Sequence, residues 1–141
     1  MMSCFNSYFG IDSDVNIPAA LLDDYLLLTD PFNEDVYGYI VGYSAAVPSY
    51  RSAIERIKKE NNNEILTLIM ASPNPEGRIY AIEAISSGNL DKIRNNKIYS
   101  NILSQLVELR ISIQAAAGCI VYSMKIDSLK KIDDAMRYVQ F

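Results

Sequence analysis

The sequence predicts a mainly α-helical protein in which short helices pack as antiparallel hairpins, as in an α-solenoid or an irregular bundle, with a small β-hairpin near the C-terminus. Three observations predict this fold. Apolar residues recur at helical spacing over most of the chain, the connections between these segments are short, and one segment near the C-terminus alternates apolar and polar residues. A chain of 141 residues has the length of one domain. We therefore expect a single helical domain over residues 1–141, with an irregular segment at residues 1–16.

The first helix is expected after Asn16, its predicted N-cap, with Pro18 in the first turn, where the missing N–H costs nothing. Pro31 ends it, because the residue before a proline avoids helical dihedral angles. Asp23 and Asp24 are expected to face solvent. The apolar face is formed by Leu21, Leu22, Tyr25, Leu26 and Leu28.

A second helix is predicted from Asn33, its N-cap, to Pro48. Gly38 and Gly42 lie four residues apart, so they would share one face of this helix and leave a shallow groove. Each glycine costs a helix about 1 kcal/mol relative to alanine, so we expect a closely packed backbone there as compensation. The helical spacing is carried by Val36, Tyr37, Ile40, Val41 and Tyr43.

Residues 49–60 form the clearest amphipathic helix, with Tyr50, Ala53, Ile54 and Ile57 as its apolar stripe. Its solvent face is expected to hold Arg51, Glu55, Arg56, Lys58 and Lys59. The run of asparagines at 61–63 ends this helix and caps a short, largely buried segment at residues 64–71.

The most specific local signal is the helix start within residues 72–85. Pro75 biases Asn74 away from helical dihedral angles, so Asn74 is the predicted N-cap and Pro75 the first helical residue. Gly88 suits the left-handed position that follows a helix end. The buried stripe is formed by Ile79, Ile82 and Ile85.

The last third of the chain is expected to hold two helices and a hairpin. Residues 90–96 form a short turn, and residues 97–109 return to the helical period. Residues 111–126 alternate and are rich in β-branched and aromatic residues, which favours a hairpin; a buried helix is the alternative that periodicity leaves open. Asp127 is expected to cap a final helix whose inward residues are Leu129, Ile132, Ala135, Met136 and Val139.

The chain contains no histidine and no tryptophan, which limits its chemistry. Histidine-based nucleophile pairs, haem ligation through histidine and most catalytic zinc sites are excluded. Cys4 and Cys119 fit no metal-ligand spacing. Cys119 is expected to be a small buried hydrophobe, and a disulfide between the two is left open for an exported protein. We therefore expect no cofactor and no metal.

Residues 12–16, Asp-Ser-Asp-Val-Asn, open like an EF-hand calcium loop. Ile17 stands where that loop needs glycine, and Asp23 stands where it needs glutamate. These residues are therefore interpreted as turn and cap residues.

Glu76, Arg78, Tyr80 and Glu83 share one predicted helix and include groups capable of acid–base chemistry. Arg78 is not at the spacing that would pair it with either glutamate. We expect the glutamates to complement the helix dipole or to pair on the surface, and Arg78 to be a surface residue.

Charge is unevenly distributed along the chain. Seven acidic and no basic residues precede Arg51, whereas 13 basic and 10 acidic residues are found from Arg51 onward. A net charge of −4 without a basic cluster argues against nucleic-acid binding, which needs Lys and Arg to neutralise phosphates. The acidic part is interpreted as a solvated face, with an acidic docking surface for a basic partner as the alternative.

No apolar run approaches the roughly 20 residues that span a bilayer, and the first residues lack the pattern of a secretory signal. We therefore expect no membrane contact and a cytoplasmic location by default, with export after removal of a leader left open.

Tyrosines gather around the second predicted helix. Such a group is more often core than surface, but tyrosine is enriched in interface hot spots. Tyr39 points away from Tyr37 and Tyr43 on a helical wheel, so one of these faces should be exposed. The candidate interaction surface consists of Tyr37, Tyr39, Tyr43, Tyr50, Asp23 and Asp24.

Residues 75–82, Pro-Glu-Gly-Arg-Ile-Tyr-Ala-Ile, followed by Gly-Cys-Ile at 118–120, resemble a pattern in uncharacterised bacterial proteins with a HEAT-like helical core. The resemblance covers the second half of the chain and implies a HEAT-like helical fold. That family has no established activity, so the resemblance implies no site residues.

Together these observations predict a non-catalytic α-helical module for protein–protein interaction. Two alternatives stay open: a hydrolase-like enzyme that uses carboxylates and tyrosines without histidine, and a self-associating structural protein. The expected partner is another protein or a second copy of the chain.

Overall fold

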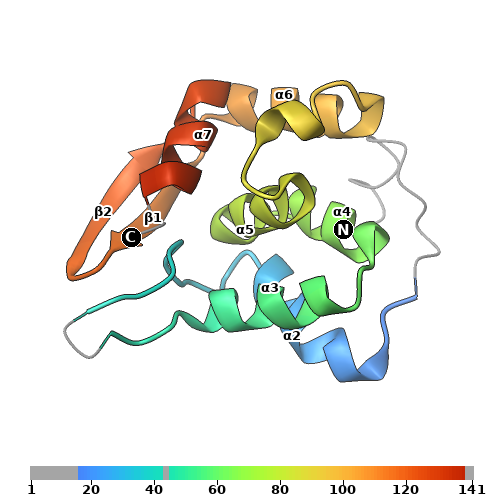
Figure 1. Cartoon of the computed structure of the whole chain (residues 1–141), viewed down its shortest axis with the longest axis horizontal. Helices are drawn as coiled ribbons and strands as arrows, with labels where there is room; N and C mark the ends of the chain where they lie inside the picture. Colours follow the sequence, from blue (N-terminus) through green and yellow to red (C-terminus); the bar gives the residue numbers. More distant parts are fainter. Residues whose placement is uncertain (1–15, 43–44, 139–141) are drawn as a thin grey trace.

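The computed structural model describes residues 16–42 and 45–138. It confirms the predicted fold class, because the described chain is mainly helical with one two-stranded antiparallel sheet (Figure 1). The elements are, in chain order, α2 (Ala19–Thr29), α3 (Ser49–Lys59), α4 (Asn63–Met70), α5 (Pro75–Ser86), the 3₁₀ turn η1 (Leu90–Lys92), α6 (Lys97–Leu109), β1 (Ser112–Ala117), β2 (Ile120–Lys125) and α7 (Leu129–Tyr138).

Helix α5 lies at the centre of the helical part. It packs against α2, α3, α4, η1 and β1, and Figure 1 shows it between the α2–α3 layer and α6. Ile79, Tyr80 and Ile82 are fully buried, while Ile85 near the helix end is partly buried. The isoleucine stripe predicted for this helix therefore contributes to the core. None of the described helices is both long and apolar enough to cross a bilayer.

Asparagine side chains begin three of the helices. Asn74 Oδ1 accepts a hydrogen bond from Gly77 N at 2.8 Å with Pro75 in the first turn, as predicted. Asn62 caps α4 and Asn96 caps α6 by the same kind of contact. Each cap satisfies backbone N–H groups that the start of a helix leaves without an internal partner. These local signals explain why α4, α5 and α6 begin within a residue of their predicted positions.

The C-terminal hairpin is confirmed, and the buried-helix alternative is wrong. β1 and β2 pair antiparallel, with Ala115 opposite Tyr122, through a two-residue turn at Gly118 and Cys119. Gly118 has a φ angle of +62°, which such a tight turn favours. Cys119 is exposed in the turn, so its predicted role as a buried hydrophobe is wrong. Cys4 lies outside the described residues.

The helix predicted over residues 33–48 is wrong, and an extended arm takes its place. The arm pairs with β1: Tyr37 N donates to Gln114 O at 2.7 Å, and Ala116 N donates to Tyr37 O at 2.8 Å. Pairing with a distant strand satisfies the same backbone groups that a helix would satisfy locally. Helical spacing of apolar residues was therefore not sufficient to make this segment a helix.

Two glycines permit the path of the arm, and neither forms the helical groove predicted for them. Gly42 has a φ angle of +78°, and the chain turns back there so that Val41 pairs with Ala46. Gly38 lies so close to β1 that an added Cβ atom would be 2.6 Å from Ala116 O. The expected close backbone approach is found at Gly38, but against a strand.

The buried face of α2 differs from the prediction. Leu22 and Leu26 are exposed, whereas Asp24 is buried, and its carboxylate binds the Arg56 guanidinium at 2.8 Å. The helix is apolar on most of its sides, so periodicity alone does not select the face that packs. Asp23 is exposed as predicted.

Two predicted caps are displaced. α2 begins after Pro18 and not at Asn16. α7 begins after Ser128, whose Oγ accepts from Lys131 N at 3.3 Å, and not after Asp127. The inward residues of α7 are confirmed at Ile132, Ala135 and Met136, while Val139 lies outside the described residues.

The start of α5 directly contacts the end of α2. Gly77 packs so closely on the Leu28 carbonyl that an added Cβ atom would lie 1.9 Å from Leu28 O. Both partners are backbone atoms within or next to helices, so neither side can yield by changing a rotamer. Glycine is therefore required at position 77 for these helices to meet.

We predict that Gly77→Ala lowers the free energy of unfolding by about 3 kcal/mol or more, because α2 and α5 must separate. The sign of this change tests the contact, since a Gly→Ala substitution in an unhindered helix raises the free energy of unfolding by about 1 kcal/mol. Denaturant unfolding followed by circular dichroism measures the change, with Ser100→Ala in α6 as a control expected to stay within about 0.5 kcal/mol. A Gly77→Ala protein as stable as the wild type would show that the two helices do not meet there.

Candidate functional site

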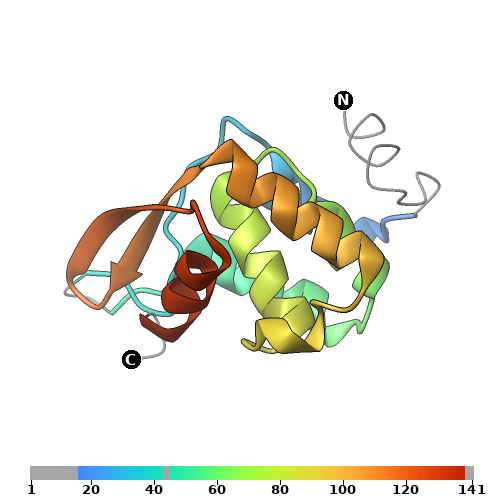
Figure 2. The ribbon, with the colours of Figure 1, turned by 90° about the horizontal axis from the view of Figure 1, so that it is seen from above.

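Two stretches of the chain without a charged residue come together beside the helices. No Asp, Glu, Lys or Arg occurs in residues 36–50 or in residues 111–124. The first stretch contains the arm, described at residues 36–42 and 45–48, and the second forms most of the β1–β2 hairpin. Figures 1 and 2 show the arm and the hairpin extending from the same side of the helical part. We call the arm and residues 111–124 together the uncharged projection.

The arm runs parallel to β1 as far as the hairpin turn. Tyr37 pairs with Ala115 near the helices, and Val41 pairs with Gly118 at the turn. Gly42 N also donates to Gly118 O at 3.0 Å. β1 therefore lies between the arm on one side and β2 on the other.

The projection exposes four aliphatic side chains, two on the arm and two directly after the hairpin turn. These are Ile40 (38% exposed), Val47 (55%), Ile120 (66%) and Val121 (49%), which we call the apolar tip. Single exposed hydrophobic residues are ordinary on a protein surface. Here four occur in segments that contain no charged residue, which is typical of a contact surface.

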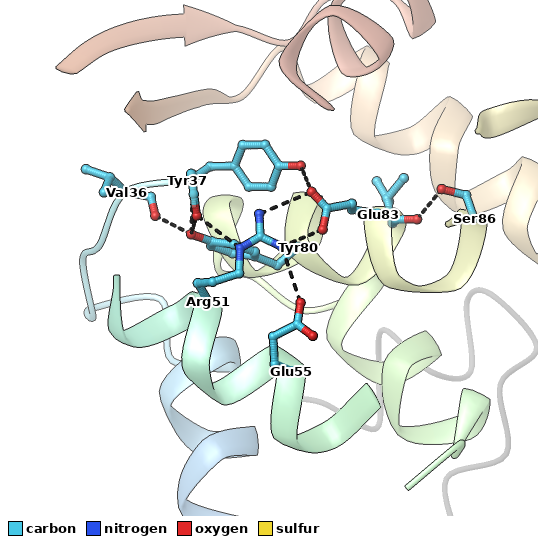
Figure 3. Close-up of polar contacts among 9 residues, drawn as sticks. Val36, Tyr37, Arg51, Glu55, Tyr80, Glu83 and Ser86 are labelled. Atoms are coloured by element: carbon cyan, nitrogen blue, oxygen red, sulfur yellow. Dashed lines mark hydrogen bonds and ion pairs between the residues drawn. The ribbon is translucent and has the colours of Figure 1, made fainter. Parts of the chain in front are cut away.

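A buried ion pair holds the arm against α3 and α5 (Figure 3). Arg51 of α3 and Glu83 of α5 are both buried, with Nη1 donating to Oε2 at 2.5 Å and Nη2 donating to Oε1 at 3.1 Å. Arg51 Nε donates to Gly38 O at 3.0 Å. The Tyr37 hydroxyl donates to Glu83 Oε1. Two adjacent residues of the arm are thus bound directly to the ion pair.

Tyrosine rings surround the Arg51 guanidinium. The distances from Arg51 Cζ to the ring centres are 3.7 Å for Tyr39, 4.7 Å for Tyr80 and 5.6 Å for Tyr37. At these distances the ring faces attract the cation. The Tyr80 hydroxyl also binds the arm backbone, because it donates to Val36 O at 2.6 Å and accepts from Gly38 N at 3.0 Å. We call Arg51, Glu83, Tyr37 and Tyr80 the anchor.

Burial sets the ionisation of the anchor. It raises the pKa of Tyr37 well above the ordinary value, and the neighbouring Glu83 carboxylate raises it further. Burial also raises the pKa of Tyr80. Burial alone would lower the pKa of Arg51, but the hydrogen bonds and negative charge of Glu83 outweigh it and raise that pKa. Both tyrosines are therefore neutral and Arg51 is charged at neutral pH.

The geometry of Glu83 favours a structural role over acid–base chemistry. Both of its oxygens are engaged, Oε1 by Tyr37 and Arg51 and Oε2 by Arg51. The hollow that reaches it measures about 120 Å³, with Tyr39 and Lys58 in its wall, whereas ligand pockets usually measure about 300 to 1,000 Å³. The anchor therefore positions the arm.

A larger open groove of about 820 Å³ lies between η1, α6 and the start of α7. Its wall carries charges of both signs, including Asp91, Arg94 and Glu108. Arg94 Nη1 lies 3.3 Å from Asp91 Oδ1, and both side chains are exposed, which makes this a weak ion pair. The groove has the features of a solvated face.

The residues predicted to form an interaction surface do not lie together on one. Tyr37 and Tyr50 are buried, and Tyr39 is partly buried against Arg51. The reason is the missing helix: residues 37 and 39 are two apart in an extended chain, so both reach the same arginine. Tyr43 lies outside the described residues, as do positions 12 and 14 of the calcium-loop pattern. On α2, Asp23 is exposed and Asp24 is buried.

Sequence reasoning wrongly placed several buried charges on the surface. Arg51, Glu83 and Arg78 are all buried. Arg78 Nη2 donates to Gln105 Oε1 at 2.9 Å, and burial lowers the pKa of Arg78 to about 10. Glu76 is buried as well and accepts a hydrogen bond from the backbone of β1. The signal that could have found the site is the pair of uncharged stretches, each bounded by charged residues.

Comparison of the chain with protein-family models, with curated proteins and with solved structures finds no match. The HEAT-like relationship inferred from the sequence therefore stays a prediction.

Glu83→Gln is predicted to lower the free energy of unfolding by about 3 to 5 kcal/mol, because Arg51 would stay charged and buried with only the half-exposed Glu55 carboxylate, 3.7 Å away, as its ion-pair partner. The double variant Arg51→Met with Glu83→Gln should be more stable than Glu83→Gln alone, since the buried positive charge is removed. Denaturant unfolding of both variants measures this difference in stability. Equal stability of Glu83→Gln and the wild type would contradict the buried ion pair.

Alkaline titration is predicted to separate the anchor tyrosines from exposed ones. The raised pKa values of Tyr37 and Tyr80 mean that the folded state holds these protons above pH 10, where the unfolded state releases them. Folding stability should therefore fall as pH rises above about 10, by roughly 1.4 kcal/mol per pH unit for each such group. Arg78 has the opposite effect on stability, because its pKa is lowered to about 10, but the tyrosines outnumber it, since burial also raises the pKa values of Tyr25, Tyr39 and Tyr50.

The measurement is the ultraviolet absorbance of tyrosinate in the folded protein and in guanidinium chloride. In denaturant all ten tyrosines should titrate together, whereas in the folded protein a fraction should titrate only as the protein unfolds. A single titration near pH 10 in the folded protein would show that the anchor tyrosines are accessible to water.

Proposed function

We propose that this protein is a non-catalytic binding module that contacts a protein partner through the uncharged projection. The observation that carries the proposal is the apolar tip, four exposed aliphatic side chains within two segments that contain no charge. Large exposed apolar patches on soluble proteins mark interaction sites. Complete burial of side chains that are about half exposed contributes roughly 1 kcal/mol each, which is enough to influence affinity.

The anchor supports this proposal because it limits the cost of binding. Hydrogen bonds from Arg51 and Tyr80 fix the arm backbone at Gly38 and Val36. A surface that is ordered before binding loses less conformational entropy when the partner arrives. The arm is therefore suited to present the tip in a defined position.

The charge distribution favours a protein over nucleic acid as the partner. The projection offers no Lys or Arg to neutralise phosphates, and the chain carries a net charge of −4. The alternative of a hydrolase-like enzyme has less support, since Glu83 is engaged by Arg51 and Tyr37 and only a small hollow reaches it.

The exposed Cys119 provides the test, because it lies in the hairpin turn beside Ile120. In a Cys4→Ser background, Cys119 is labelled with a photoactivatable maleimide and irradiated in a lysate of the native host. We expect covalent capture of a defined protein, and we expect capture to persist at high salt because the contact is apolar.

Val47→Asp should reduce this capture at least about tenfold, because a buried unpaired carboxylate opposes the contact. Leu109→Asp is the matched control, since Leu109 on α6 is 53% exposed and Val47 is 55% exposed, and it should leave capture unchanged. Absence of any captured protein, or an equal loss in both variants, would contradict the proposed function.

A further inference from the structure

β2 forms the outer edge of the uncharged projection, and among the described residues it has a strand partner on one side only. Ile126 N donates to Ile111 O at 2.7 Å, which fixes the phase of the ladder. The backbone groups of the even-numbered residues of β2 therefore point toward β1. Those of Val121, Ser123 and Lys125 point outward.

This edge has few of the features that keep strands apart. Open edges in natural proteins are usually blocked by charges, proline or a bulge. β2 contains no proline, its register with β1 is regular over its whole length, and its single charge is Lys125 at the end. Val121, Ser123 and Lys125 are all exposed. The edge is thus open to a further strand.

We propose that the further strand is β2 of a second copy of this chain, paired antiparallel about Ser123. This inference goes beyond the proposed function, because it uses the outer edge of β2, whereas the arm residues of the apolar tip lie on the other side of β1. In this register Ser123 lies opposite Ser123, Val121 opposite Lys125, and Tyr122 opposite Met124. The outward N–H and C=O groups of both strands are then paired with each other.

In this register, the residues of β2 that lie opposite each other in the two copies form favourable pairs. Tyr122 and Met124 share the half-buried face of the strand, so an aromatic ring meets a thioether twice, which is a favourable cross-strand contact. The two Lys125 side chains lie at opposite ends of the paired strands, whereas a register centred on Lys125 would place like charges opposite each other. Two-fold pairing of this kind uses the same surface on both copies.

The register also fixes a distance. Each Cys119 lies four residues from the two-fold axis, so at about 3.4 Å per residue the two Cys119 residues are roughly 27 Å apart. Association of two copies through their hairpin turns would instead place the two Cys119 residues next to each other. The separation therefore distinguishes edge pairing from tip-to-tip contact.

The first measurement is the molar mass in solution, by size-exclusion chromatography with light scattering over a concentration series. We expect twice the 15.8 kDa of one chain. Ser123→Pro removes an outward N–H without removing a bond to β1, and it should raise the dimer dissociation constant at least about tenfold. Ser123→Ala is the matched control. Like Ser123→Pro, it loses the hydroxyl that accepts a hydrogen bond from Gln114 Nε2 at 2.7 Å, but it keeps the backbone N–H. This variant should therefore stay dimeric.

The second measurement uses spin labels on Cys119 in the Cys4→Ser background, which leaves β2 unchanged. A distance distribution centred at roughly 27 Å between the two Cys119 residues supports the proposal. A much shorter distance, or a monomer at every concentration, overturns it. Equal dimerisation of Ser123→Pro and Ser123→Ala also overturns it. A monomer that still captures another protein through Cys119 would leave the proposed function intact, whereas a monomer that captures nothing would overturn both.

Discussion

The Arg51–Glu83 ion pair is the interaction on which the arm depends. A buried ion pair adds little net stability by itself, because both groups lose their hydration. Here the pair gains hydrogen bonds that only one arrangement supplies, from Tyr37 to Glu83 and from Arg51 to Gly38. Residues 36–40 of the arm form a single extended stretch whose backbone groups cannot pair with one another, so its position must be fixed by other elements. The pair therefore acts by specifying where the arm lies against α3 and α5.

Much of the helical part could be predicted because its signals are local. Asn74 and Pro75 define the start of α5 within four residues of sequence, and the apolar period of residues 97–109 matches α6. The arm could not be predicted this way, since Tyr37 pairs with Ala115, a residue 78 positions later. Its apolar spacing is compatible with a helix, and only the distant strand decides between the two structures. The same limit applies to α2, where apolar residues on most sides hide the packing face.

The candidate site was less predictable than the fold, for a physical reason. Arg51 lies in a helix that also carries exposed Lys58 and Lys59, and nothing in its neighbours distinguishes a buried arginine from a solvated one. Its burial follows from Glu83 on another helix and from ring faces on the arm. Composition does carry one signal, because charge is absent from two separate stretches that the fold brings together. That signal identifies the projection but gives neither its anchor nor its order of strands.

The charges beside the projection and their absence within it serve two different requirements. At its base, Arg51 and Glu83 supply the strong, directional contacts that hold an extended segment in place. Toward its end, charge would oppose burial against another surface, since an unpaired charge is costly to desolvate. A strand edge that stays in water is usually protected by charge, yet Val121 and Ser123 of β2 are exposed and uncharged. An edge of this composition is suited to being covered, which is what the proposed pairing of two copies would do.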